Sequence, residues 1–87
     1  MEIVPYEITH GMKLSKLNFR LREKKKADGF CWVSNCHDIA GVSDNDWLVE
    51  VNHQSTKGMG VRAIITLLRK TSKPFTLGFY RNKRKKN

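Results

Sequence analysis

Two cysteines and three histidines are the residues whose side chains could bind a metal or act as nucleophiles. Four residues separate Cys31 from Cys36, and no second cysteine pair completes a zinc-binding set. A zinc site with His37 or His53 is therefore a minor alternative to a simpler interpretation, in which Cys31 is a buried thiol within an apolar strand. His10, His37 and His53 fall in turn-like segments, with no acid or nucleophile at a recognisable spacing. We expect no enzymatic activity, no metal and no cofactor.

Charge is the second chemical feature of the chain. It has 17 basic and 8 acidic residues, and a formal net charge of +9 at pH 7. The basic residues form one block at Lys24, Lys25 and Lys26 and another at 81–86. Such charge favours acidic partners, which are acidic peptides, anionic lipid surfaces or nucleic acid. The simpler alternative is a solvated loop and a disordered tail.

The sequence argues against nucleic-acid binding and against a membrane-spanning segment. The aromatic residues Phe19, Phe30, Trp32 and Phe75 fall on strand faces that the pattern predicts to be buried, so no stacking platform is expected. The sequence has no apolar run of bilayer length and no signal-peptide pattern at its start. We expect a soluble protein of the cytoplasm.

The chain of 87 residues predicts a single domain over 1–82, followed by a basic C-terminal tail at 83–87. The clearest strand pattern is at 17–22, where Leu17, Phe19 and Leu21 alternate with polar residues. Other strands are predicted near 3–9, at 30–34, at 47–52, briefly within 53–59, and at 75–81. Pro5 is expected either to weaken the start of the first strand or to place it at a sheet edge.

Apolar residues at 61, 64, 65 and 68 predict one amphipathic helix over 60–70. A short helical turn is expected near 38–40. The predicted fold is therefore mainly β with two helices (α+β): a small, partly open barrel or sandwich of five to six strands, capped by one long and one short helix.

The order of these elements resembles a PDZ domain nearly end to end, from about Pro5 to Arg81. The stretches that carry the resemblance are AGV at 40–42, DWLVEVN at 46–52, GM at 58–59 and LLR at 67–69. The PDZ resemblance implies a protein–protein interaction module that binds the C-terminal peptide of a partner.

The carboxylate-binding loop of this family has the pattern Gly-Leu-Gly-Phe, and its match here is Lys16-Leu17-Asn18-Phe19. Both glycines are absent. The resemblance implies that the backbone N–H groups of Leu17, Asn18 and Phe19 bind the ligand carboxylate, with Lys16 adding positive charge nearby. Asn18 is expected to replace a glycine because asparagine tolerates the left-handed conformation.

The resemblance also implies that the peptide adds as a strand between 19–23 and helix 60–70. The pocket for its terminal side chain would consist of Leu17, Phe19, Leu21, Ile65 and Leu68. The wider groove would include Arg20 and Val61. Val61 stands where many family members have a histidine that bonds a ligand Ser or Thr, so an apolar residue at ligand position −2 is expected.

The expected partner is thus an apolar-ended C-terminal peptide with acidic residues upstream, which would face Arg20, Arg22 and the basic block at 24–26. The alternative function is binding to phosphoinositide or another anionic membrane lipid, through Lys24, Lys25, Lys26 and the tail. Both functions suit a cytoplasmic location, with the inner face of the plasma membrane and cell junctions as candidate sites.

Overall fold

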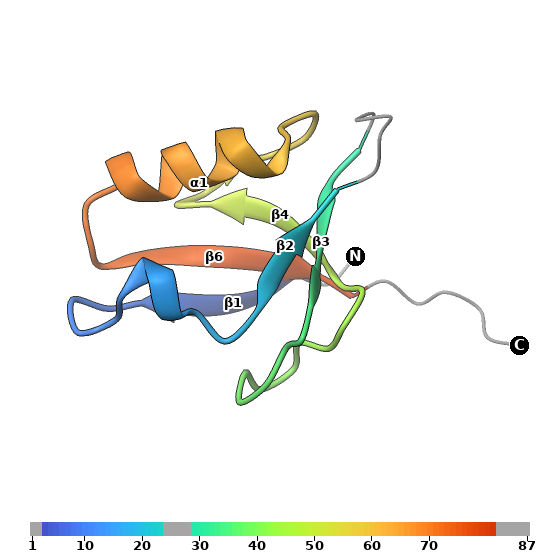
Figure 1. The fold of residues 1–87 in the computed structure, drawn as a ribbon, viewed down its shortest axis with the longest axis horizontal. Coiled ribbons are helices and arrows are strands. Elements are labelled where there is room, and N and C mark those ends of the chain that lie inside the picture. Colours follow the sequence, from blue (N-terminus) through green and yellow to red (C-terminus); the bar gives the residue numbers. More distant parts are fainter. Residues whose placement is uncertain (1–2, 24–28, 82–87) are drawn as a thin grey trace, which may run out of the picture.

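The computed structural model describes residues 3–23 and 29–81 (Figure 1). These residues form a sheet of six strands, one α-helix and one 3-10 helix, so the predicted α+β class is confirmed. The elements are β1 (Ile3–Ile8), η1 (Leu14–Lys16, the 3-10 helix), β2 (Arg20–Arg22), β3 (Cys31–Ser34), β4 (Trp47–Val51), β5 (Gln54–Ser55), α1 (Val61–Lys70) and β6 (Phe75–Tyr80).

The strand order leaves β1 and β2 at the two ends of the sheet. It runs β1–β6–β4–β3–β2, with β5 paired to β4, and every pairing is antiparallel. Pro5 lies in the edge strand β1, opposite Gly78 of β6, and the edge position predicted from this proline is confirmed. Within residues 3–23 and 29–81, the other end strand, β2, pairs only with β3.

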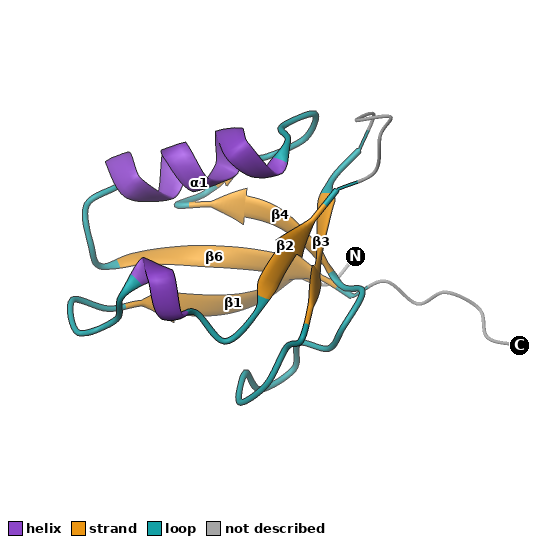
Figure 2. Cartoon of the chain, in the orientation of Figure 1, coloured by secondary structure: helices purple, strands orange, loops and turns teal. Residues whose placement is uncertain are grey.

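The core lies between the curved sheet and the helix α1, and Figure 2 shows how the helical segments flank the strands. Ile64 and Leu68, four residues apart, are the buried residues of α1, as the 3.6-residue period requires. Phe19 reaches this core from the segment before β2 and meets Phe79 of β6 edge to face, with ring centroids 5.6 Å apart. The segment that precedes β2 is therefore held by core packing.

The strand predicted over 17–22 is shorter in the structure, where only Arg20–Arg22 pairs as β2. The preceding residues follow η1, and the Lys16 N–H donates to the Lys13 carbonyl at 2.9 Å inside that turn. Asn18 then joins the neighbouring segment by a single bond, which its carbonyl accepts from the His37 N–H at 3.0 Å. The residues at 17–19 thus follow a 3-10 turn and do not pair as part of β2.

The prediction of a short helix near 38–40 is wrong. The short helix that the structure describes is η1, at Leu14–Lys16. Asn35, Asp38 and Gly41 all have positive φ, at 51°, 56° and 83°. A right-handed helix cannot continue through left-handed residues. The Asp44 side chain accepts a hydrogen bond from the Cys36 N–H at 2.7 Å, which stabilises this loop as a series of turns. No helix within the described residues is long and apolar enough to cross a bilayer.

Candidate functional site

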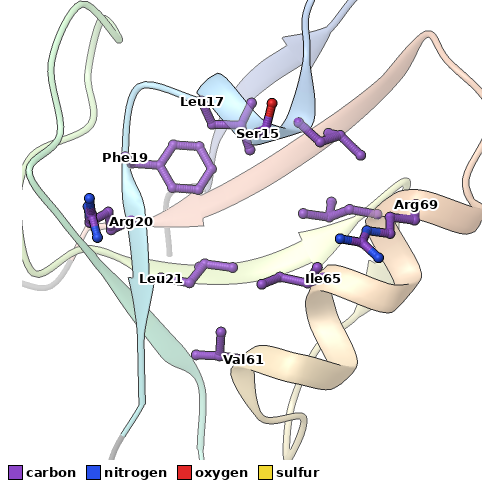
Figure 3. Close-up of a pocket in the computed structure, with 10 residues that line it drawn as sticks. Ser15, Leu17, Phe19, Arg20, Leu21, Val61, Ile65 and Arg69 are labelled. Atoms are coloured by element: carbon purple, nitrogen blue, oxygen red, sulfur yellow. The ribbon is translucent and has the colours of Figure 1, made fainter.

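A groove of about 640 Å³ lies between β2 and α1 (Figure 3). Three segments of the chain form its walls: η1 with the residues after it, the strand β2, and one side of the helix. Its lining residues are Leu14, Ser15, Leu17, Phe19, Arg20, Leu21, Val61, Ile65, Leu68 and Arg69. Figure 3 shows Leu21 and Ile65 pointing toward one another across the groove, so its interior is mainly apolar.

The strand wall of the groove has an open hydrogen-bonding edge. Val33 of β3 donates its N–H to Asp46 O at 2.9 Å and accepts from Asn45 N at 2.8 Å, so its backbone groups face the β4 side. Val33 pairs in register with Leu21. Backbone groups alternate in direction along an antiparallel pair, so the N–H and C=O of Leu21 face away from β3, toward the groove. Phe19 precedes the paired residues of β2, and its neighbour Asn18 bonds through its carbonyl to the His37 N–H after β3.

Adjacent residues of α1 either pack in the core or line the helix wall of the groove. Ile64 is fully buried and anchors α1 to the core, whereas the next residue, Ile65, is 40% exposed in the groove. Val61, Ile65 and Arg69 recur every four residues and form one stripe along the groove. A large apolar side chain left open at this point provides apolar surface for a ligand.

The segment at 13–19 closes one end of the groove. Leu14 and Ser15 of η1 line the groove itself, whereas Lys16 and Asn18 line an adjoining hollow of about 340 Å³. Lys73 Nζ donates a hydrogen bond to the carbonyl of Met12, the residue just before this segment, and so joins its start to the connection before β6. Leu17 lines both hollows, so it forms the partition between them.

The opposite end of the groove is bridged by Glu23. The Val61 backbone N–H, in the first turn of α1, donates a hydrogen bond to Glu23 Oε1. A Cβ atom on Gly60 would lie only 2.8 Å from that oxygen, so the absence of a side chain at Gly60 leaves room for the carboxylate. The Glu23 side chain therefore joins both walls and satisfies one of the unpaired N–H groups of a helix start.

The fold of this chain matches a solved structure. No protein-family model and no curated protein sequence matches the chain. The structure does match the PDZ domain of a GIPC protein from a choanoflagellate, with a TM-score of 0.76 and 13% sequence identity, over 100% of this chain and 98% of that one. The chain has a PDZ fold. The resemblance read from the sequence is thereby confirmed at the level of the fold.

The PDZ fold brings most of the predicted groove residues together. Leu17, Phe19, Arg20, Leu21, Val61, Ile65 and Leu68 all line the main groove. Phe19 and Leu68 are buried and form its floor, at 6% and 3% exposure. In Figure 3 the Arg20 side chain is directed away from α1, so it lies at the outer rim of the groove. The predicted roles of these residues in binding stay predictions.

Two of the four residues predicted for the carboxylate loop lie beside the groove, not in it. Lys16 is exposed in the adjoining hollow, and Asn18 is half-buried there. Asn18 is also absent from the described residues with positive φ. The expectation that Asn18 would supply a left-handed conformation is therefore wrong, because the loop follows a 3-10 turn that needs none. The basic block of Lys24, Lys25 and Lys26 lies outside the described residues, as does the tail at 83–87.

Sequence reasoning missed Leu14, Ser15 and Arg69 as lining residues, and Glu23 as the bridge to α1. Arg69 could have been found, since it is four residues beyond Ile65 on the same helix stripe. Leu14, Ser15 and Glu23 had no such signal, because the sequence does not show how the segment at 13–19 folds against the helix. These contacts join residues far apart in the chain.

The cysteines lie in the body of the fold. Cys31 is buried, and its thiol donates to the Met59 carbonyl at 3.4 Å. Burial raises the pKa of the Cys31 thiol, and the nearby Glu23 carboxylate adds to the rise. Burial likewise raises the pKa of Cys36, with further contributions from Asp44 and Asp46. Both shifts disfavour the thiolate, which is the form that attacks electrophiles or binds metals.

Proposed function

We propose that this domain binds the free C-terminus of a partner protein, which adds as a strand to β2 in the groove beside α1. The observation that carries the proposal is the open edge of β2 next to an apolar groove. The N–H and C=O groups of Leu21 face the space that the peptide backbone would occupy. A peptide strand would pair with these groups, and its alternate side chains would enter the groove.

The direction of the peptide follows from which end of the groove is closed. Its carboxylate would lie at the closed end, near the residues that precede β2, so its chain would run antiparallel to β2. The terminal side chain would then contact Leu17, Phe19 and Leu68. The ligand residue at position −2 would pair with Leu21 and face Val61. The side chains of Leu21 and Val61 are apolar and have no hydrogen-bonding group. Apolar residues are therefore favoured at the terminus and at position −2.

The carboxylate would be bound by backbone N–H groups, with positive charge close by. Phe19 lines the groove directly before β2, and Arg69 lines it from the last turn of the helix. Arg69 thus supplies the positive charge at the groove itself, and Lys16 supplies more from the adjoining hollow. A charged acceptor strengthens each hydrogen bond that it takes from such donors.

The test is calorimetric titration with one apolar-ended peptide in two forms, with a free and an amidated C-terminus. We expect amidation to weaken binding by at least ~1.4 kcal/mol, a factor of about ten, because it removes the charged acceptor. Arg69→Gln should reduce the difference in affinity between the free and the amidated peptide. Lys57→Gln, which removes one exposed charge outside the groove, is the matched control. Equal binding of both forms to the unmutated domain would show that the terminus is not recognised.

A further inference from the structure

Glu23 is the acidic residue that contacts both walls of the groove. It directly follows β2, two residues after Leu21, so period-2 alternation places its side chain on the groove side of the strand. Its hydrogen bond from the Val61 N–H confirms that placement. Glu23 is exposed, and no ion pair to it is found among the described residues. Its negative charge therefore stands at the end of the groove opposite η1, without a positive partner among the described residues.

The register of a bound peptide decides which ligand residue meets this carboxylate. In an antiparallel pair each step back along the ligand is one step forward along β2. With the terminal residue opposite Phe19, position −2 is opposite Leu21 and position −4 is opposite Glu23. Side chains at positions 0, −2 and −4 share one face of the ligand strand. Position −4 therefore faces α1, as the Glu23 side chain does.

We propose that Glu23 is a specificity-determining residue that selects Lys or Arg at ligand position −4. This inference rests on the proposed peptide binding and adds a charge preference to it. The Glu23 carboxylate is held on the first turn of the helix, so it is already positioned when the ligand arrives. A basic side chain at −4 would pair with it, and an acidic one would be repelled.

The opposite face of β2 carries the opposite charge. Arg20 and Arg22 are both exposed and alternate with Leu21 along β2. Arg20 lies at the outer rim of the groove with its side chain directed away from α1, and ligand side chains at −1 and −3 would also point to this outer side. Acidic ligand residues are therefore expected at −1 and −3 and disfavoured at −4. The general preference for acidic upstream residues, predicted from the sequence, becomes an alternating pattern of charge along the ligand.

The experiment uses five-residue peptides with apolar residues at 0 and −2, and Lys, Ala or Glu at −4. Their affinities are measured by fluorescence anisotropy at two salt concentrations, for the unmutated chain, Glu23→Gln and Glu7→Gln. Glutamine keeps an oxygen that can accept from the Val61 N–H but has no charge. Glu7 is exposed on β1 and lies outside the groove lining, so its variant controls for net charge.

We expect the unmutated chain to bind the Lys peptide roughly two- to tenfold more tightly than the Glu peptide, with less difference at high salt. Glu23→Gln should remove this preference, and Glu7→Gln should keep it. Equal affinities in the unmutated chain, or a preference that survives Glu23→Gln, would overturn the proposal. So would its loss in Glu7→Gln, which would mark a net-charge effect. Amidated versions separate the two proposals: if they bind as well as the free forms, the proposed function itself fails.

Discussion

The backbone and the side chain of Val61 have different roles in the groove. Its N–H donates to the Glu23 carboxylate, while its half-buried side chain lines the groove next to Ile65. A valine side chain has no hydrogen-bonding group, so a ligand hydroxyl facing it would lose its bonds to water without replacement. This single side chain should therefore decide which residues are accepted at position −2.

The Val61→His variant tests this role. Histidine would place a donor at the groove where two methyl groups now lie, so we expect the preference at −2 to shift from apolar residues toward Ser and Thr. The measurement is an array of C-terminal peptides varied only at −2, read with both proteins. A Ser or Thr preference in the unmutated domain would contradict the role given to Val61.

At the scale of elements, α1 has to be both part of the core and one wall of the groove. Two neighbouring isoleucines divide these tasks: Ile64 is 0% exposed and Ile65 is 40% exposed. A step of 100° per residue turns adjacent side chains to different surfaces of the helix, so the division follows from helix geometry. Stability and binding should therefore be separable by two substitutions of the same kind.

Ile64→Ala should lower the free energy of unfolding by about 2–5 kcal/mol, because it leaves a cavity in the core. Ile65→Ala should cost less than about 1 kcal/mol, because its side chain is partly in solvent already. Ile65→Ala should instead weaken peptide binding. Urea unfolding and peptide titration of both variants provide the check. An equal loss of stability in the two variants, or unchanged binding by Ile65→Ala, would show that Ile65 is a core residue and not a groove residue.

At the scale of the whole molecule, the charge of the chain acts over longer distances than any groove contact. The net charge of +9 attracts an acidic peptide before contact, whereas hydrogen bonds and apolar packing act only within the groove. Three of the positive charges, Lys24, Lys25 and Lys26, follow Glu23 directly in the sequence. They should influence the rate of association more than the choice of terminal residue.

Replacing Lys24, Lys25 and Lys26 with Ser should lower the association rate of an acidic peptide and flatten its salt dependence, with terminal specificity unchanged. Stopped-flow kinetics at two salt concentrations measure both quantities. The matched control replaces Lys83, Lys85 and Lys86 with Ser, which removes the same charge from the tail. Loss of all peptide binding in a folded Lys24–Lys26 variant would favour the alternative of an anionic surface reader.

Much of the fold could be predicted from the sequence, because its main signals are local. The apolar spacing at 61, 64, 65 and 68 predicts a helix that the structure has at Val61–Lys70, and the strands expected near 3–9 and at 75–81 are found at Ile3–Ile8 and Phe75–Tyr80. Most of the residues that line the groove were also predicted. The resemblance to PDZ domains indicates which strand and helix residues lie next to one another in the fold, and no local sequence pattern does so. Predictions failed at 17–19 and 38–40, where left-handed residues and a 3-10 turn override simple periodicity.

What the sequence by itself determined is thus which segments are helix or strand and which of their faces are apolar. Only the tertiary structure decided that β2 has an open edge, that η1 closes one end of the groove, and that Glu23 bridges its other end to Val61. The physical reason is distance along the chain. Glu23 and Val61 are 38 residues apart, and their contact depends on how every strand between them pairs and turns.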